Sequence, residues 1–402
     1  MTPEVRDRIE QIRHGNVPEG YKKGKIGIVP VEWDEVPFST LFASTSEYTD
    51  DLEQYPLYSL TIEDGITAKT ERYERSHLVK KENSYKVVRP NDYAYNPMNI
   101  RFGAVARHKG DIPVAVSGYY DIFTTIHESD RAFMDSFLTC GPMITYYNKV
   151  STGSLIEKQR VHFSDFMEFS LALPSIEERK KIAEILTTQD KVIELKEKLL
   201  TEKQRQKKYL MQQLLTGKKR LRNYTEPWST VELEEVFDYI QPTPYLVAST
   251  NYSDDYSTPV LTAGKTFVLG YTNEINGIYS NLPVVIFDDF TTDSKFVDFP
   301  FKAKSSAMKI LQIKDGYNIL FAYEAMQLIR FVVGGHERHW ISKYSKLTID
   351  VPRLEEQNAI SNVISAMDKE LSLIEQDIEQ EKQKKKALMQ LLLTGIVRVK
   401  GE

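Results

Sequence analysis

The feature that most constrains this chain is a stretch that occurs twice, over residues 173–220 and 351–398. The two copies align without a gap at an offset of 178 positions (351 minus 173). Identical residues at matched positions include the pairs Pro174/Pro352, Glu178/Glu356, Ile182/Ile360, Asp190/Asp368, Lys207/Lys385, Leu210/Leu388, Leu214/Leu392 and Gly217/Gly395. Because self-similarity at a fixed period reflects repeated architecture, the two halves of the chain are predicted to share one plan.

Each copy is predicted to form one long helix. Pro174, followed by Glu177 and Glu178, is typical of a first helical turn, where acidic groups suit the positive end of the helix. The Thr-Gly pairs at 216–217 and 394–395 indicate where the helices stop. At ~1.5 Å per residue, about 40 residues would make a rod of roughly 60 Å.

Within each copy, apolar residues recur at alternating steps of four and three, which is the heptad pattern of a coiled coil. The apolar seam residues are Ile182, Leu186, Ile193, Leu200, Leu210 and Leu214, then Ile360, Ile364, Leu371, Ile374, Ile378, Leu388 and Leu392. Both seams become polar at the same place, at Lys203/Lys207 and Glu381/Lys385. We therefore predict an antiparallel coiled coil, because a whole globular segment between the helices lets the chain run out and back. Heptads alone would also fit a helix that dimerises the protein, but two copies, each after its own globular segment, favour a spacer.

The segments outside the helices are predicted to be β-rich, because short β-branched and aromatic runs alternate with turns. Each opens with a tryptophan, Trp33 or Trp228, which we expect to anchor a core. The fold class is therefore α+β, with two β-rich domains in a pseudo-twofold tandem, separated by the two helices. The expected boundaries are 1–172 and 218–350 for the two domains, and 173–217 and 351–402 for the helices with the C-terminal tail.

Composition excludes several classes of protein. A single cysteine, Cys140, excludes internal disulfides and cysteine-based metal clusters, which fits a reducing compartment. No apolar run approaches 18 residues and the first residues are charged, so we expect a cytoplasmic protein with neither a signal peptide nor a membrane span. The formal net charge of −5 does not itself indicate a nucleic-acid binder, although local basic patches decide phosphate contact.

Several stretches carry a resemblance to one family. They are residues 58–61, 92–104 (DYAYNPMNIRFGA) and 116–120 in the first half, and residues 260–265, 286–292 (IFDDFTT) and 304–309 (KSSAMK) in the second. Together with both helices and their Leu-Leu-Thr-Gly ends, they resemble the DNA-specificity (S) subunit of type I restriction–modification systems over essentially the full length. The resemblance implies two target-recognition domains, each reading one half of a bipartite double-stranded DNA site. It also implies that the helices set the half-site spacing and hold two methyltransferase (M) subunits, with restriction/translocase (R) subunits joining the complex.

The residues best suited to contact DNA are polar or basic side chains near these stretches, since cations and small donors bind phosphates and amides read bases. The candidates are Asn96, Asn99, Arg101, Arg107, Lys109, Thr291, Thr292, Ser294, Lys295, Lys302, Lys304, Ser305, Ser306 and Lys309. Stretches shared between targets cannot themselves encode sequence, so scaffold and phosphate roles are expected for Asn96 and Arg101. Base-reading residues are expected in other loops, such as 64–83 or 242–256.

Catalytic motifs were sought and none is complete. Residues 96–99 (NPMN) are similar to an adenine-methyltransferase motif but lack its second proline and its aromatic residue. Asp288, Asp289 and Lys295 are spaced too tightly for a nuclease site, and His336 with His339 has no surrounding zinc motif. We therefore expect no catalytic residue, metal or cofactor on this chain. The resemblance implies that S-adenosylmethionine, ATP and magnesium are used by partner subunits. The alternatives are a self-contained restriction–methylation enzyme and a coiled-coil adaptor that binds only protein.

Overall fold

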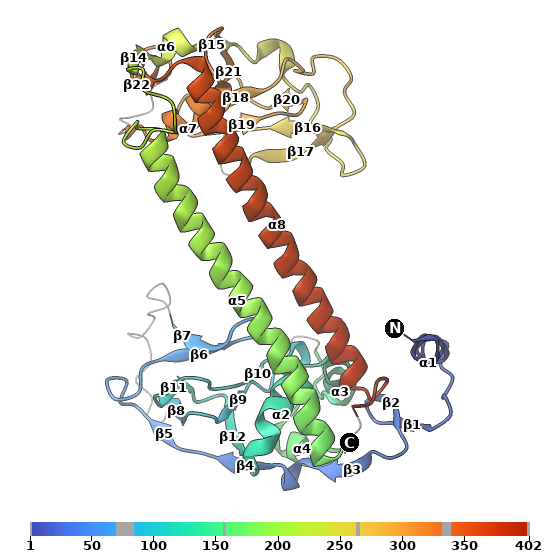
Figure 1. The fold of residues 1–402 in the computed structure, drawn as a ribbon. Coiled ribbons are helices and arrows are strands. Elements are labelled where there is room, and N and C mark those ends of the chain that lie inside the picture. The colour runs from blue at the N-terminus through green and yellow to red at the C-terminus, as the bar shows by residue number, and fades with distance from the viewer. Residues whose placement is uncertain (1, 70–83, 156–157, 263–265, 332–338, 400–402) are drawn as a thin grey trace. The chain divides into compact units, whose positions relative to one another are not determined.

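The computed structural model describes residues 2–69, 84–155, 158–262, 266–331 and 339–399. The chain divides into two compact units, residues 1–196 with 377–402 (unit 1) and residues 197–376 (unit 2). Each unit contains part of both long helices, α5 (Ile176–Leu214) and α8 (Leu354–Leu392), as Figure 1 shows by colour. Both helices have 39 residues and begin two positions after the prolines that were expected to start them.

Both long helices end in the same way. Gly217 and Gly395 adopt positive φ angles of 66° and 71°, which glycine tolerates because it has no Cβ. The amide of Lys219 then donates to the carbonyl of Gln213, and at matched positions Val397 donates to Leu391. This pattern satisfies carbonyl groups that a helix end would otherwise leave without partners.

Unit 1 places its strands in several small sheets, which lie beside the first part of α5 (Figure 1). Its sheets have the orders β10-β9-β12-β4, β11-β8-β5, β13-β3, β1-β2 and β6-β7. The strands are β1 (Tyr21–Gly24), β2 (Gly27–Pro30), β3 (Asp34–Pro37), β4 (Phe42–Thr45), β5 (Tyr48–Thr49), β6 (Tyr58–Thr61), β7 (Gly65–Ala68), β8 (Tyr85–Val88), β9 (Tyr93–Tyr95), β10 (Val105–Arg107), β11 (Val114–Ser117), β12 (Asp121–Thr125) and β13 (Ser170–Leu173). The other helices are α1 (Pro3–Arg13), α2 (Arg131–Phe137), α3 (Gly141–Val150) and α4 (Phe163–Met167), with single 3-10 turns at Phe38–Thr40, Ile100–Phe102 and Glu128–Asp130.

Unit 2 has a four-stranded sheet of order β15-β21-β18-β19, a three-stranded sheet of order β17-β16-β20, and the pair β14-β22. Its elements are β14 (Ser229–Glu232), α6 (Leu233–Val236), β15 (Phe237–Ile240), β16 (Thr258–Leu261), β17 (Val268–Thr272), β18 (Val284–Asp288), β19 (Ser294–Val297), β20 (Lys302–Ala303), β21 (Met308–Ile313), α7 (Ile319–Gln327) and β22 (Thr348–Val351). The 3-10 turns are Thr243–Tyr245 and Tyr344–Lys346. Strand β18 is buried on both faces, as its continuous apolar run predicts.

The main hydrophobic cores of the two units use the long helices at matched positions. In unit 1, Ile182 and Leu186 of α5 join Leu392 and Leu393 from the end of α8. In unit 2, the residues at the 178-residue offset pack in the same way. Ile360 and Ile364 of α8 join Leu214 and Leu215 from the end of α5. Each core thus packs the start of one long helix with the end of the other, so the sequence repeat is also a repeat of packing.

A buried ion pair closes each core and also obeys the repeat. In unit 1, the guanidinium of Arg398 donates to both carboxylate oxygens of the buried Glu178, at 2.7 and 2.8 Å. In unit 2, Arg220 donates to both oxygens of the buried Glu356, at 2.7 and 2.6 Å. Bidentate arginine–carboxylate contacts are strong, and they also fix the relative orientation of the two side chains. The α+β plan with one scaffold used twice is therefore confirmed.

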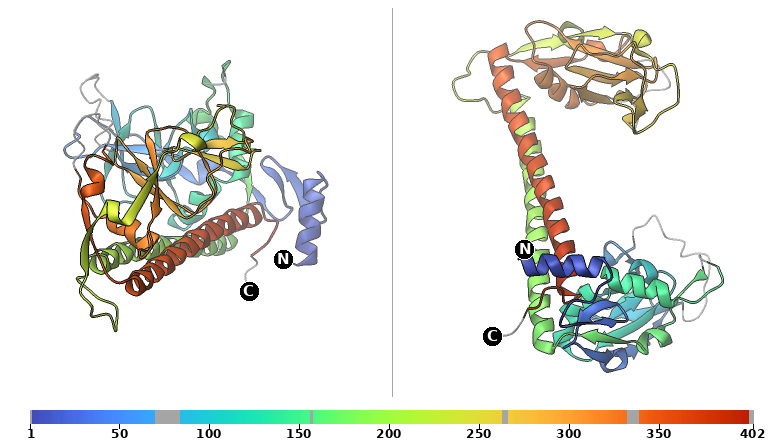
Figure 2. Two further views of the ribbon diagram at one scale, coloured as in Figure 1. Left: turned by 90° about the horizontal axis from the view of Figure 1, so that it is seen from above. Right: turned by 90° about the vertical axis from the view of Figure 1, so that its right-hand side faces the viewer.

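In each unit the two long helices run antiparallel, as Figure 2 also shows. In unit 1, Lys385 lies 2.5 Å from Asp190, whereas Lys196 lies 2.9 Å from Glu381, so rising numbers on α5 meet falling numbers on α8. The hydrogen bond from Gln189, followed by that from Lys196, lowers the pKa of Glu381 to about 2. In unit 2, Lys203 pairs with Glu370 at 2.5 Å, and Lys207 pairs with Asp368.

The predicted seam residues are all shielded from solvent to some degree. Eight are buried, namely Ile182, Leu186, Ile193, Leu214, Ile360, Ile364, Ile378 and Leu392. Five are half-buried, namely Leu200, Leu210, Leu371, Ile374 and Leu388. Beyond each core, charged pairs accompany the apolar seam residues of the same unit.

Candidate nucleic-acid interface

Residues 92–104 of unit 1 form a buried strand followed by a tight turn. Strand β9 is fully buried, and the side-chain oxygen of Asn96 accepts from the amides of Met98 and Asn99, at 3.1 and 3.4 Å. Arg101 follows on the 3-10 turn, where it is buried and donates to Gln159 at 2.5 Å. In contrast, Asn99 and the ring of Phe102 are exposed. This stretch therefore exposes the amide of Asn99 and the ring of Phe102 to solvent, while Arg101 stabilises the interior of unit 1.

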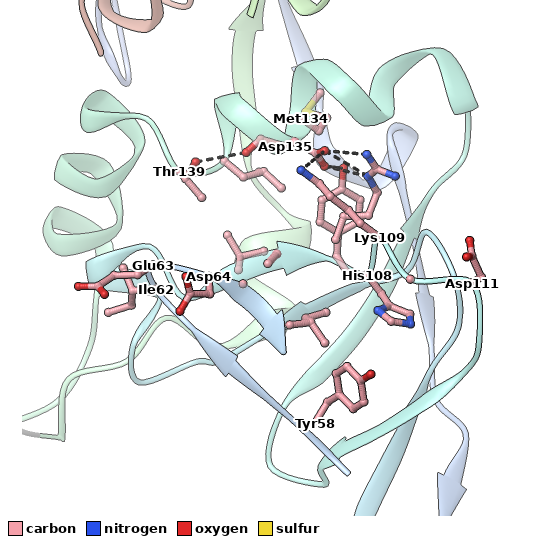
Figure 3. A pocket seen from close by; sticks show the side chains of 18 of the residues that line it. Tyr58, Ile62, Glu63, Asp64, His108, Lys109, Asp111, Met134, Asp135 and Thr139 are labelled. Carbon is pink, nitrogen blue, oxygen red and sulfur yellow. Dashed lines mark hydrogen bonds and ion pairs between the residues drawn. The ribbon is translucent and has the colours of Figure 1, made fainter. Parts of the chain in front are cut away.

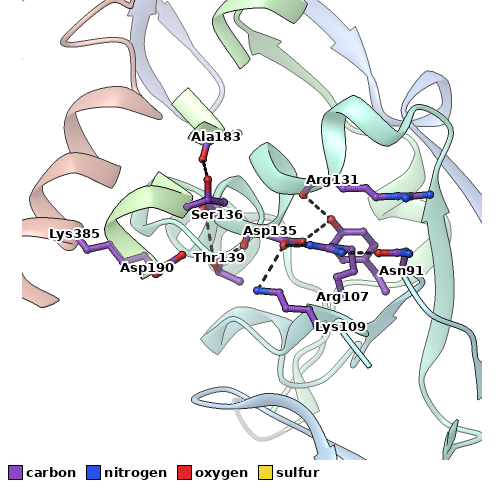
Figure 4. Close-up of polar contacts among 12 residues, drawn as sticks. Asn91, Arg107, Lys109, Arg131, Asp135, Ser136, Thr139, Ala183, Asp190 and Lys385 are labelled. Carbon is purple, nitrogen blue, oxygen red and sulfur yellow. Dashed lines mark hydrogen bonds and ion pairs between the residues drawn. The ribbon is translucent and has the colours of Figure 1, made fainter. Parts of the chain in front are cut away.

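Arg107 at the end of β10 is committed to α2. Its guanidinium holds both carboxylate oxygens of Asp135, at 2.9 and 2.8 Å, and also reaches Asn91 at 2.6 Å (Figure 4). The hydrogen bond that Arg107 donates to Asp135 raises the pKa of Arg107, and burial raises that of Tyr93, whose hydroxyl also donates to Asp135. Lys109 lies 3.7 Å from Asp135 but is mostly exposed. Of these two predicted cations, Lys109 alone can reach a ligand without losing a buried ion pair.

A cavity of about 530 Å³ opens beside this network, between the β6–β7 hairpin and α2 (Figure 3). Its wall includes the acidic residues Glu63, Asp64 and Asp111, whereas Asp135 is neutralised by Arg107. Three carboxylates besides Asp135, against one exposed lysine, would repel a phosphate backbone. We therefore do not place DNA phosphates in this cavity.

In unit 2, Asp288 and Asp289, which are spaced too tightly in the sequence for a nuclease site, shape a turn. Asp288 accepts from the amides of Phe290 and Thr291, at 2.7 and 3.1 Å. Asp289 is buried and lies 3.5 Å from the ammonium of Lys309, which is itself 1% exposed. Thr292 completes the turn with φ of 61°. These acids hold backbone groups and a buried cation, and they do not converge on a common point.

Lys302 is likewise an internal cation, 2.8 Å from Glu274 and buried. Ser294 is buried and accepts from Gln327 at 2.7 Å. Thr291, Lys295, Ser305 and Ser306 are exposed, and Lys304 is half-buried near the ring of Tyr252. The basic residues of this stretch thus divide into a buried group that stabilises unit 2 and a surface group that can meet DNA.

Taken together, the structure separates the 14 candidates into two groups. Six serve the fold, namely Asn96, Arg101, Arg107, Ser294, Lys302 and Lys309. Eight are accessible, namely Asn99, Lys109, Thr291, Thr292, Lys295, Lys304, Ser305 and Ser306. We leave the first group out of the interface, because DNA contact would expose a buried polar group or break its ion pair.

Sequence reasoning did not single out the exposed Ile275 as a candidate. Ile275 stands among turn-forming asparagines and glycine. An apolar residue in such a polar setting is the signal that could have identified it. Of the loops expected to read bases, residues 70–83 lie outside the described residues, as do 263–265 of the shared stretch.

The described residues include no group of three or more His, Cys, Asp or Glu side chains that could hold a metal ion. His336 lies outside them, and His339 is fully buried against the ring of Phe331. Cys140 is buried, and burial raises the pKa of its thiol to about 11, so it is protonated at neutral pH. In the same part of the chain, no helix has the length and apolar character needed to cross a membrane.

The long helices expose apolar side chains away from the seam. Leu195 and Leu199 on α5 are about half exposed, as are Tyr209 on α5 and Leu373 on α8. Neighbouring exposed apolar residues are a common mark of a protein-binding surface. Leu195 in unit 1, and Leu199, Tyr209 and Leu373 in unit 2, are therefore further candidates for protein contact, distinct from the loops of the β-rich parts.

Comparison with known proteins gives two kinds of likeness. The profile of the "Type I restriction modification DNA specificity domain" matches residues 225–383. The Escherichia coli protein "Type I restriction enzyme EcoR124I/EcoR124II specificity subunit" is 54% identical over 126 residues, which is 30% of this chain and 31% of that protein. The "Putative type I restriction enzyme MjaX specificity subunit" of Methanocaldococcus jannaschii is 24% identical over 429 residues, covering 99% of this chain and 93% of that one.

Two solved structures resemble the chain over nearly its whole length. The type I restriction–modification S subunit from M. genitalium superposes with a TM-score of 0.54 at 12% identity, covering 90% of this chain and 96% of that one. A chain from a study of complex assembly and conformational transition of the type I R-M system superposes with a TM-score of 0.55 at 14% identity, covering 92% and 99%. At these identities the likeness is one of fold.

Proposed function

We propose that this chain, which is similar to type I restriction–modification specificity subunits, reads a bipartite double-stranded DNA site for a methylating and restricting complex. The observation that carries this proposal is that one scaffold is used twice under two different surfaces. The ion pairs Glu178–Arg398 and Glu356–Arg220 coincide at the 178-residue offset, whereas the loops above them differ. Two β-rich domains with different surfaces on the same scaffold suit a target made of two different half-sites.

We assign residues 1–172 and 218–350 to the two reading heads, and 173–217 and 351–402 to the spacer helices with their tail. Accessible donors such as Lys109, Lys295 and Lys304 would bind phosphates, and exposed amides such as Asn99 would approach bases. The net charge of −5 makes these local groups, rather than the whole-protein field, responsible for attracting DNA.

The exposed residues Leu195, Leu199, Tyr209 and Leu373 would hold two methyltransferase subunits, which in turn connect the restriction/translocase subunits. S-adenosylmethionine, ATP and magnesium would be used by those subunits, and this chain would be a non-catalytic, cytoplasmic addressing subunit. A self-contained enzyme is disfavoured because the acids that suggested it are buried or cap a turn. An adaptor that binds only protein would leave the matched pair of different heads without a role.

The test is methylome sequencing of the host with and without this chain, while the partner subunits are kept. We expect adenine methylation at one bipartite sequence to vanish when the chain is removed and to return when it is restored. Methylation that persists without the chain would contradict the proposal. An enzyme acting alone is distinguished by incubating the purified chain with DNA and S-adenosylmethionine, where we expect no methyl transfer.

Lengthening the helix pair is expected to change the gap between half-sites and leave both half-site sequences unchanged. Four residues would be inserted after Glu197 in α5 and four after Gln376 in α8, because this region lies outside both main cores. Four residues add about 6 Å, close to two base-pair steps of ~3.4 Å, and restore nearly the same helical face. We expect the preferred gap to grow by one to two base pairs in the methylome.

The matched control inserts the same four residues at the exposed turn of Gly316, where φ is +88° and a Cβ would meet nothing within 4 Å. That variant should keep the original gap. An unchanged gap in the helix-insertion variant, at full activity, would mean that the partner subunits alone position the two heads.

A further inference from the structure

The turn between β17 and β18, residues 273–277, presents an unusual side chain. Ile275 at its tip is 83% exposed, the highest exposure among the large apolar residues in the described part of the chain. Asn273 and Asn276 on either side are also exposed. Single exposed apolar residues are common on protein surfaces, so the argument depends on how this turn is built.

Buried polar groups hold the turn from behind. The carboxylate of Glu274 accepts from the amides of Ala248 and Ser249, at 3.0 and 2.9 Å, and pairs with Lys302 at 2.8 Å. The ammonium of Lys302 also donates to the carbonyl of Asn276 at 2.6 Å. Lys302 is buried, and the hydrogen bond from it lowers the pKa of Glu274. Burying a lysine is costly unless its charge is paired, and here the pair holds one side of the turn.

The other side of the turn is fixed by close packing. Gly277 has φ of +66°, and a Cβ there would lie 2.5 Å from the carbonyl oxygen of Pro244, so a larger residue cannot replace it without moving the chain. The amide of Glu274 donates to the buried hydroxyl of Thr272 at 3.3 Å. The exposure of Ile275 is therefore built into an ordered turn and does not come from a loose loop.

The three exposed side chains match the major-groove edge of an A·T pair. Adenine presents an N7 acceptor and an N6 donor, which an asparagine amide can bind together, while thymine presents a C5 methyl group to apolar side chains. We propose that this turn is a base-reading element of unit 2, in which Ile275 packs on a thymine methyl group and Asn273 or Asn276 binds the paired adenine. The inference rests on the proposed function and deepens it, since it names one base pair and the residues that read it.

The experiment uses the full chain in complex with its modification subunits and a duplex carrying the site found by methylome sequencing. Each thymine of the unit 2 half-site is replaced in turn by uracil, which removes only the C5 methyl group. We expect one replacement to weaken binding of the wild-type complex about fourfold, the value of one buried methyl group. Ile275→Ala should weaken binding of the thymine duplex about tenfold and should be insensitive to that same replacement.

The matched control is Ile341→Ala, which removes an exposed isoleucine elsewhere in unit 2 and should keep wild-type binding and wild-type sensitivity to uracil. The inference is overturned if no uracil replacement weakens wild-type binding, or if Ile275→Ala remains as sensitive as wild type. It is also overturned if Ile275→Ala loses the modification subunits, since the residue would then bind protein. Failure of the proposed function would be seen separately, as the absence of any bipartite methylation that depends on the wild-type chain.

Discussion

Replacing Glu178 with alanine is expected to destabilise the closure of unit 1 by about 3 kcal/mol, the lower end of the range for a broken buried ion pair. Arg398 would keep only its exposed partner Glu32. Glu178 is buried and holds the guanidinium of Arg398, and it also accepts from the amide of Val399 at 3.2 Å. The loss should appear as hydrogen exchange about a hundredfold faster at the amides of Gly395 and Val397, since 1.4 kcal/mol is a factor of ten.

The matched control is Glu177→Ala, one residue earlier in the same helical turn but exposed, which should change stability by less than ~0.5 kcal/mol. Because the scaffold is repeated, Glu356→Ala should have the same effect in unit 2, at the amides of Gly217 and Lys219, with the exposed Glu355 as its control. If Glu178→Ala exchanged like Glu177→Ala, the ion pair would not be what closes the core.

Exchanging the interior of unit 2 for that of a type I specificity subunit is expected to change one half-site completely and to leave the other half-site and the gap unchanged. The structure defines the borders: residues 233–347 lie between β14 and β22, which pair with each other. These borders keep the Arg220–Glu356 ion pair and the contact of Gly217 with Trp228. Methylation at the original site should fall to background, because a head reading the wrong sequence loses about 1–3 kcal/mol for each mismatched base pair.

The reciprocal exchange serves as the control. Residues 38–169 of unit 1 lie between β3 and β13, which also pair, and their replacement should change only the other half-site. Methylome sequencing of both chimaeras measures the outcome. A chimaera in which both half-sites change would mean that the two heads do not read independently.

The helical scaffold could be predicted from the sequence because it depends on local periodicity. A four-three spacing of apolar residues predicts which face of a helix is shielded from solvent. The polar break at Lys203 and Lys207 indicates where the seam residues have charged partners. The antiparallel direction followed from the length of chain between the copies. No distant contact had to be known in advance.

The DNA-contacting residues could not be predicted in this way, because residue type does not reveal a partner far along the chain. Arg101 is occupied by Gln159, 58 positions later, and Arg107 by Asp135, 28 positions later. Lys302 is occupied by Glu274, 28 positions earlier. Each of these cations is predicted as a surface group by composition and becomes internal only when the fold brings its acid or amide alongside. The accessible lysines that remain, Lys109, Lys295 and Lys304, have no sequence pattern that distinguishes them from the buried ones.

The charged pairs between the helices determine how strictly the register of the two helices is fixed. Each exposed pair contributes little free energy, but in unit 1 the positions of Asp190, Lys196, Glu381 and Lys385 are correct in one register only. Sliding α8 by one heptad in one direction would put Leu388 and Lys384 where Glu381 and Asp377 now meet Lys196, so that register loses both ion pairs and gains a repulsion. Because these ion pairs favour the native register, we expect the two helices not to slide along each other in unit 1. The length of the helix pair then changes only by the insertion or deletion of whole residues.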